Sequence, residues 1–172
     1  VFSAKSGEAD ALFVLNIITN EIEKINLDLE GIFQPIWNPN NRNTEIAFIG
    51  NNGENSDVYI YNYKNETLIN LTNDWFSDSD VSWSIDGEYL YFISNRNEYN
   101  FTNTEIALSI LYESNFNIDN TDIYKIYKNN RKIERITSTL FNESSPLELN
   151  DGKSIIFLSN ESGINNLYII KN

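Results

Sequence analysis

The sequence contains no cysteine, no histidine and no methionine in 172 residues, and only three prolines. The absence of cysteine and histidine excludes disulfides, Cys/His zinc sites, cysteine nucleophiles and serine–histidine catalytic pairs from these residues. Carboxylates are abundant, but neither spacing nor pattern distinguishes one pair of them as a general acid and base. We therefore expect a non-enzymatic protein with no cofactor and no metal site.

Basic residues are also scarce. Twelve lysines and arginines stand against 25 aspartates and glutamates, which gives a formal net charge of −13. Such a charge repels phosphate backbones, so we expect no nucleic-acid partner. No apolar run approaches the roughly 18 residues that a membrane-spanning helix needs, so we also expect no membrane insertion.

One short segment recurs along the chain. The segments "LFVLNI", "VYIYNY", "IYKIYK" and "LYIIKN" begin at Leu12, Val58, Ile123 and Leu167, at intervals of 46, 65 and 44 residues. A period near 44 to 46 that holds four short strands is typical of the blades of a β-propeller. The recurring segment around Val58 is apolar or aromatic on both alternating faces, as expected of a strand packed between neighbouring blades.

The turn residues agree with this division. Asp86-Gly87 and Asp151-Gly152 each join two predicted strands, and Asp and Gly tolerate the positive φ that tight hairpins need. We therefore predict an all-β protein, a β-propeller of four-stranded antiparallel blades. The set of blades is incomplete, with two full blades and two partial ones in a single domain over residues 1–172. The expected units are a partial blade at 1–27, a blade at 33–72, a blade at 80–137 with an insertion at about 97–121, and a partial blade at 144–172.

The repeats resemble the PD40, or WD40-like, repeats of the TolB family of six-bladed propellers. That pattern consists of Trp-Ser-Pro-Asp-Gly, an apolar strand ending in Phe and Ser, then Asp-Ile-Tyr and a closing Leu-Thr. The matching residues, spread over about three repeats, are Trp37, Pro39, Asp57, Tyr59, Leu71, Thr72, Trp83, Ser84, Asp86, Gly87, Phe92, Ser94, Asn95, Arg96, Asp122, Ile123, Tyr124, Ile136, Thr137, Asp151, Gly152, Phe157, Ser159 and Asn160. Ile85 stands in place of the proline, and Glu148 stands where the other two repeats have tryptophan.

Two complete blades between partial ones indicate a piece of a longer chain, because propellers typically need at least four blades to close. The alternative is a chain that takes its missing strands from a second copy. In either case the open blade edges make self-association a candidate contact.

Functional candidates lie in the loops. The connection between second and third strand spans ten residues from Phe48 to Val58, but 31 from Phe92 to Ile123. The inserted part contains "TEIALSILYES", which fits either an amphipathic helix or a hairpin. An insertion on a repeat scaffold often marks the binding face, and the alternative is a family-specific decoration without a partner.

The loop "NDWFSDSD" is expected on the same rim as the insertion, because strand direction alternates within a blade. Its aromatic residues with an acidic border suit a protein interface, and packing between blades is the alternative role for the two rings. A calcium site is a further alternative, although the spacing fits no EF-hand loop. The candidate partner-binding residues are Trp75, Phe76, Asp78, Asp80, Tyr99, Phe101, Tyr112 and Phe116.

The resemblance to TolB implies a module that binds a protein partner through its rim and central funnel, in the periplasm or outside the cell. Two other functions remain open, because one propeller architecture serves many. The blades are also compatible with the gating propeller of a prolyl-oligopeptidase-type serine hydrolase whose catalytic domain lies outside this sequence. They are likewise compatible with a carbohydrate-binding or lyase propeller.

Overall fold

The computed structural model describes residues 1–40, 44–99 and 116–171 of the chain, and these residues form β-strands, turns and loops. The strands are β1 (Phe2–Ser6), β2 (Ala9–Leu15), β3 (Ile22–Ile25), β4 (Gly31–Trp37), β5 (Glu45–Asn51), β6 (Ser56–Asn62), β7 (Thr67–Asn70), β8 (Asp78–Trp83), β9 (Tyr89–Ser94), β10 (Asp122–Tyr127), β11 (Ile133–Arg135), β12 (Glu143–Glu148), β13 (Ser154–Ser159) and β14 (Asn166–Lys171). The helix or hairpin predicted within the insertion falls in residues 100–115, outside the described residues.

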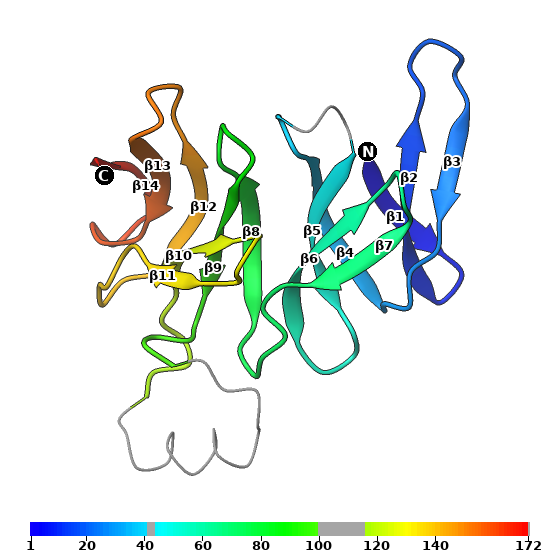
Figure 1. The fold of residues 1–172 in the computed structure, drawn as a ribbon. Coiled ribbons are helices and arrows are strands. Elements are labelled where there is room, and N and C mark those ends of the chain that lie inside the picture. Colours follow the sequence, from blue (N-terminus) through cyan, green and yellow to red (C-terminus); the bar gives the residue numbers. More distant parts are fainter. Residues whose placement is uncertain (41–43, 100–115, 172) are drawn as a thin grey trace.

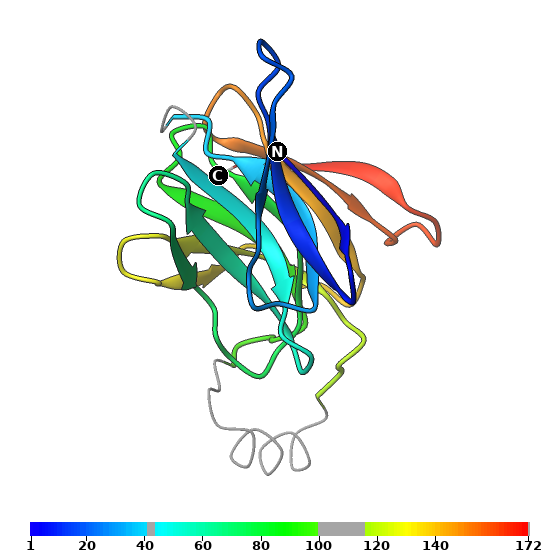
Figure 2. The same cartoon turned by 90° about the vertical axis from the view of Figure 1, so that its right-hand side faces the viewer.

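The strands form four antiparallel sheets that follow one another in chain order (Figures 1 and 2). The outer two are three-stranded, with the orders β1-β2-β3 and β12-β13-β14. The inner two are four-stranded, with the orders β4-β5-β6-β7 and β11-β10-β9-β8. The predicted fold class, an incomplete β-propeller of four-stranded blades, is therefore confirmed. We refer to the sheets as blades one to four.

Apolar side chains fill the spaces between neighbouring blades. One cluster joins blades two and three, and includes Ile60 from β6 and Leu90 from β9. Two further clusters join blades one and two, and blades three and four. Strands β5 and β6 are buried over almost their whole length because each faces a blade on both sides.

The recurring third strand occupies the same place in each blade, but its environment differs. Leu12, Val58 and Ile123 are each 0% exposed, whereas the equivalent Leu167 is 68% exposed. Leu167 lies on β14, at the edge of blade four, and no further blade packs beyond it in the described structure. The difference in exposure thus arises from the presence or absence of a neighbouring blade and not from the position of the residue within its own blade.

The first strands of three blades share a β-bulge that the sequence analysis did not predict. The register of β4, β8 and β12 shifts at the same position, next to Gln34, Asp80 and Ser145. These three residues have φ values of 52°, 50° and 54°, a left-handed conformation that non-glycine residues adopt at a cost. Repetition of the bulge shows that it is a built feature of these strands.

Side chains at the bulges link the blades. Gln34 Nε2 donates to Asp80 Oδ1 at 3.0 Å, and the Ser145 backbone N–H donates to Asp80 Oδ2 at 2.8 Å. The Asp80 carboxylate therefore bridges β4, β8 and β12, and aligns the first strands of blades two, three and four.

In each four-stranded blade, one threonine just after the last strand accepts a hydrogen bond from the third strand. Thr72 Oγ1 accepts the Val58 N–H at 3.1 Å, and Thr137 Oγ1 accepts the Ile123 N–H at 2.8 Å. Both amide groups are buried, so these hydroxyls satisfy donors that would otherwise lose their hydrogen bonds. The closing Thr of the repeat pattern is thus explained by backbone satisfaction.

We expect Thr137→Val to lower the free energy of unfolding by about 1–3 kcal/mol, because it leaves the buried Ile123 N–H without an acceptor. The matched control is Thr137→Ser, which retains the hydroxyl and should cost less than about 1 kcal/mol. Urea unfolding followed by circular dichroism measures both. A loss in Thr137→Val no larger than that in Thr137→Ser would contradict the role assigned to the hydroxyl.

Candidate interaction surface on the loop rim

The connections between second and third strands emerge at the same edge as the connections between blades, at the lower edge in Figure 1. We call this edge the loop rim, and it comprises residues 26–30, 51–55, 71–77, 95–99, 116–121 and 136–142. Hydrogen bonds tie the two kinds of loop together: Glu30 N to Asn51 O at 2.8 Å, and Asn120 Nδ2 to Phe141 O at 2.7 Å. Neighbouring loops of the rim are therefore joined by hydrogen bonds.

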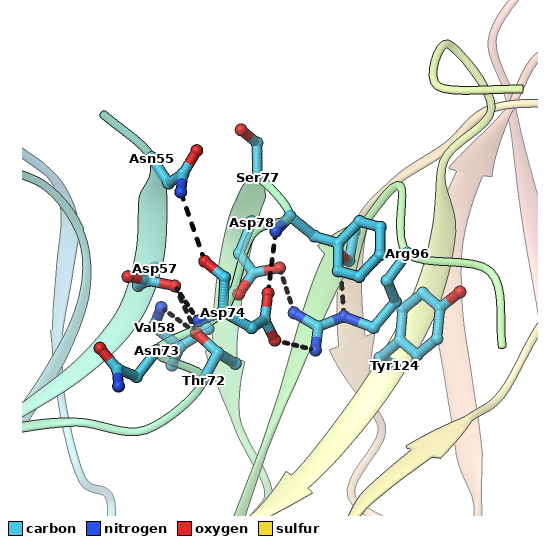
Figure 3. Close-up of polar contacts among 12 residues, drawn as sticks. Asn55, Asp57, Val58, Thr72, Asn73, Asp74, Ser77, Asp78, Arg96 and Tyr124 are labelled. Atoms are coloured by element: carbon cyan, nitrogen blue, oxygen red, sulfur yellow. Dashed lines mark hydrogen bonds and ion pairs between the residues drawn. The ribbon is translucent and has the colours of Figure 1, made fainter. Parts of the chain in front are cut away.

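A buried arginine lies at the centre of the loop rim (Figure 3). The side chain of Arg96 is 1% exposed and pairs with two carboxylates. Its Nη1 contacts Asp74 Oδ2 at 2.6 Å, and its Nη2 contacts Asp78 Oδ1 at 2.7 Å. Its Nε donates to Ser94 Oγ at 2.9 Å. Arg96 thereby holds the loop between blades two and three against the base of the insertion.

Aromatic rings complete the surroundings of this guanidinium group. Its carbon atom lies 5.8 Å from the ring centroid of Phe76, 5.1 Å from that of Phe92 and 5.7 Å from that of Tyr124. These are cation–π distances, and the rings also exclude water from the ion pairs. Packing and charge pairing therefore act on the same residue.

The cluster carries one carboxylate more than it has cations. Asp78 Oδ2 is buried and accepts no hydrogen bond in the described structure, although the hydroxyls of Thr72 and Ser94 lie near this carboxylate. Burial raises the pKa of Asp74 to about 7, against the lowering effect of Arg96, and burial also raises the pKa of Asp78. Both acids therefore hold a proton more readily than a free aspartate does, and the negative charge of Asp78 adds to the raised pKa of Asp74.

Asp57 connects this cluster to blade two. Its carboxylate accepts hydrogen bonds from the Thr72 hydroxyl at 3.1 Å and from Asn70 Nδ2 at 2.8 Å. The Asp74 backbone N–H points to the same carboxylate at 3.4 Å. The loop 71–77 is consequently anchored from both of the blades that it joins.

Two of the predicted partner-binding residues are buried. Phe76 is 1% exposed and Asp78 is 3% exposed, because the first packs on Arg96 and the second neutralises it. Neither side chain is available to a partner in this structure. For Phe76 the packing alternative describes its position correctly.

The other predicted residues divide into three groups. Trp75 is partly exposed, and its ring packs edge-on against Phe76 at 5.5 Å between centroids. Tyr99 and Phe116 are half-buried at the base of the insertion, with their ring centroids 6.0 Å apart. Asp80 lies on the inner strand β8, and Phe101 and Tyr112 lie outside the described residues.

Sequence reasoning missed a second buried acid, Glu143, which occupies in blade four the place of Asp78 in blade three. It is 2% exposed and accepts hydrogen bonds from Thr139 Oγ1 at 2.8 Å and Thr137 Oγ1 at 3.3 Å. Burial raises the pKa of Glu143. The repeat alignment contains the signal, since Glu161 replaces the arginine that pairs with Asp78.

No group of three or more acidic side chains is placed to hold a metal ion within residues 1–40, 44–99 and 116–171. In the same residues, no helix is long and apolar enough to cross a membrane.

No protein-family model matches this chain, and no curated protein matches it either. Solved structures do match. TolB from Acinetobacter baumannii is 19% identical, with a TM-score of 0.66 over 95% of this chain and 35% of that protein. A putative TolB from Agrobacterium tumefaciens is 15% identical, with a TM-score of 0.70 over 95% of this chain and 53% of that protein.

The similarity is not restricted to TolB. An oligogalacturonate lyase in complex with manganese is 15% identical, with a TM-score of 0.63 over 94% of this chain and 39% of the lyase. Peptidases are also among the similar structures. At this level of identity the matches define the fold alone, an incomplete β-propeller of the kind found in TolB. The chain spans between about a third and about a half of the length of the two TolB proteins.

Proposed function

We propose that this chain is the blade-forming part of a non-enzymatic β-propeller that binds a protein partner through its loop rim and central funnel. The observation that carries the proposal is the Arg96 cluster. In it a buried arginine pairs with two buried aspartates and so holds the loops of the rim in one conformation. A rigid, preorganised surface lowers the entropy lost on association. The similarity to TolB structures also supports a propeller that binds a protein partner.

Trp75 is the best anchor on this surface. Its side chain is partly exposed, yet its ring is held in place by the buried Phe76. Tryptophan is enriched among residues that dominate binding energy, and a ring fixed before binding loses little freedom. Asp80, Tyr99 and Phe116, together with Phe101 and Tyr112, belong to the same proposed surface.

The test is affinity capture with the chain as bait, from an envelope extract of the organism that encodes it. Trp75→Ala should reduce the captured partner by at least about tenfold, because anchor residues typically contribute 2 kcal/mol or more. Ile18→Ala is the matched control, since Ile18 is an 88% exposed apolar residue on the β2–β3 turn, outside the loop rim. Equal capture by the two variants would contradict the proposed surface, and an unchanged melting temperature confirms that both are folded.

The peptidase matches favour a second candidate, a gating propeller attached to a serine hydrolase domain. The complete reading frame decides between the two. A Gly-x-Ser-x-Gly motif followed by Asp and His supports the hydrolase, and a leader peptide with a small α/β domain supports the TolB-like module.

Two further features of the proposal concern surroundings and assembly. We place the module in the periplasm or outside the cell, as the TolB resemblance implies. We also propose that the open edges of blades one and four support self-association, since edge strands present unpaired backbone groups.

A further inference from the structure

An open polar pocket of about 510 Å³ lies on the loop rim, between the base of the insertion and the loop that leads from blade three to blade four. We call it the amide pocket. Its lining includes Asn97, Asn117, Asn120, Arg135, Ser138 and Phe141. A second hollow of about 280 Å³ shares Asn97 and Arg135 with it. The pocket has the size of a small-molecule site, and none of the residues above belongs to the Trp75 surface.

Arg135 is held rigidly at the wall of the pocket. Its Nη2 contacts the buried Asp122 Oδ2 at 2.5 Å and also donates to Asn97 Oδ1 at 3.1 Å. Its Nε donates to the Thr137 carbonyl oxygen at 2.9 Å. These three contacts fix the plane of the guanidinium group, and Asp122 neutralises its charge from behind.

The asparagine side chains are also fixed, and their partners determine which way each amide points. Asn97 Oδ1 accepts from Arg135, and its Nδ2 makes no hydrogen bond to a described residue. Asn120 is buried and donates from Nδ2 to Phe141 O at 2.7 Å, so its Oδ1 is left over. Asn117 Oδ1 accepts the Asp119 N–H at 3.1 Å, which leaves its Nδ2.

Several polar groups around the pocket consequently make no hydrogen bond to any described residue. They are the donors Arg135 Nη1, Asn97 Nδ2 and Asn117 Nδ2, the acceptor Asn120 Oδ1, and the Ser138 hydroxyl, which can do both. Among the residues that the structure describes, no acidic side chain lines the pocket, although the protein carries a net charge of −13. The set therefore suits a neutral ligand with several groups that both donate and accept.

Apolar contact is available beside these polar groups. Phe141 is half-buried at the pocket wall, and Leu140 is 92% exposed at its mouth. Vicinal hydroxyls on a ring with an apolar C–H face require this combination of amide, hydroxyl and aromatic surface.

We propose that the amide pocket binds a neutral saccharide. The pocket shares no lining residue with the proposed protein-binding surface, but the two adjoin at the base of the insertion, where Tyr99 and Phe116 lie within two residues of Asn97 and Asn117. Hydrogen bonds from rigid groups give the specificity, and the shallow, open form of the pocket implies an affinity on the order of 1 mM for one or two sugar units.

The test is a solution NMR titration of the chain with a panel of neutral sugars at about 10 mM, around ten times the expected dissociation constant. The panel comprises glucose, galactose, N-acetylglucosamine and their disaccharides, with sodium acetate and a blocked tripeptide as competitors of other chemistry. At least one saccharide should shift the side-chain amide signals of Asn97 and Asn120 in a saturable way. The two competitors should not displace it.

Ser138→Gln is the variant that tests the location. Ser138 is exposed and its hydroxyl makes no hydrogen bond in the described structure, so a larger side chain should fill the pocket without disturbing the fold. It should weaken saccharide binding by about tenfold or more. Ser77→Gln, an exposed serine elsewhere on the same rim, is the matched control and should bind as the parent does. The proposal is overturned if no sugar binds, if Ser138→Gln binds normally, or if acetate or the tripeptide competes.

Discussion

Replacing Arg96 with methionine should lower the free energy of unfolding by about 3–5 kcal/mol, the typical cost of removing one partner of a buried ion pair. Methionine fills a similar volume among Phe76, Phe92 and Tyr124, so the effect arises from charge and not from a cavity. Asp74 and Asp78 would then be buried 2.6 and 2.7 Å from the positions of their lost donors, without compensation.

Urea unfolding at pH 8 measures this loss, because both acids are then most strongly driven to ionise. Arg131→Met is the matched control: Arg131 is exposed and has no carboxylate partner in the described part of the chain, so its replacement should cost less than about 0.5 kcal/mol. Adding Asp74→Asn and Asp78→Asn to Arg96→Met should recover part of the stability. Similar losses for the Arg96 and Arg131 variants would show that the ion pairs do not stabilise the rim.

Stability should also fall as the pH rises from about 4 to about 7. The pKa of Asp74 is raised from 3.8 to about 7 in the folded protein, so in this range the folded state binds a proton that the unfolded state has released. Its contribution is fully present below pH 4 and is lost as the pH passes the folded pKa. A shift of this size corresponds to about 4 kcal/mol, at 1.36 kcal/mol for each pH unit. Carboxyls with a lowered pKa, such as Asp151, act in the opposite direction but below this window.

Asp78→Asn should flatten this pH dependence. The variant removes the negative charge of Asp78, which contributes to the raised pKa of Asp74, so Asp74 should ionise more readily beside Arg96. The new amide nitrogen can occupy the position of the unpartnered Oδ2, near the Thr72 and Ser94 hydroxyls. We expect the variant to be more stable than the parent at pH 8 and similar to it at pH 4.5. Thermal unfolding at half-unit pH steps provides the measurement, and parallel profiles for the two proteins would contradict an effect of Asp78 on the titration of Asp74.

The repeat spacing predicted the blades because strand pairing is local and periodic. Asp86-Gly87 forms its turn as expected, with Gly87 at φ 69°, and Leu12, Val58 and Ile123 on the third strands are each 0% exposed. The residues matched to the repeat pattern also have physical roles. Thr72 and Thr137 satisfy buried amide groups, and Asp57 anchors the loop between blades.

The candidate site was predictable only in part. The loop 71–77 does lie on the same rim as the insertion, as alternating strand direction requires. The sequence did not predict which of its side chains face solvent, because Trp75 and Phe76 are adjacent aromatic residues and either ring could be the buried one. The buried Arg96 accounts for the difference. Its guanidinium group packs on the ring of Phe76 and pairs with Asp74 and Asp78, so Phe76 is the ring that is buried.

Sequence by itself determined the strand content, the order of the blades and the exclusion of cysteine and histidine chemistry, since each depends on composition or on contacts between neighbours in the chain. Tertiary structure alone decided the bulges at Gln34, Asp80 and Ser145, the shared acid–arginine cluster and the amide pocket around Arg135. Those features join side chains from different loops and blades. Their energies depend on burial and on distances between atoms, which a linear pattern does not contain.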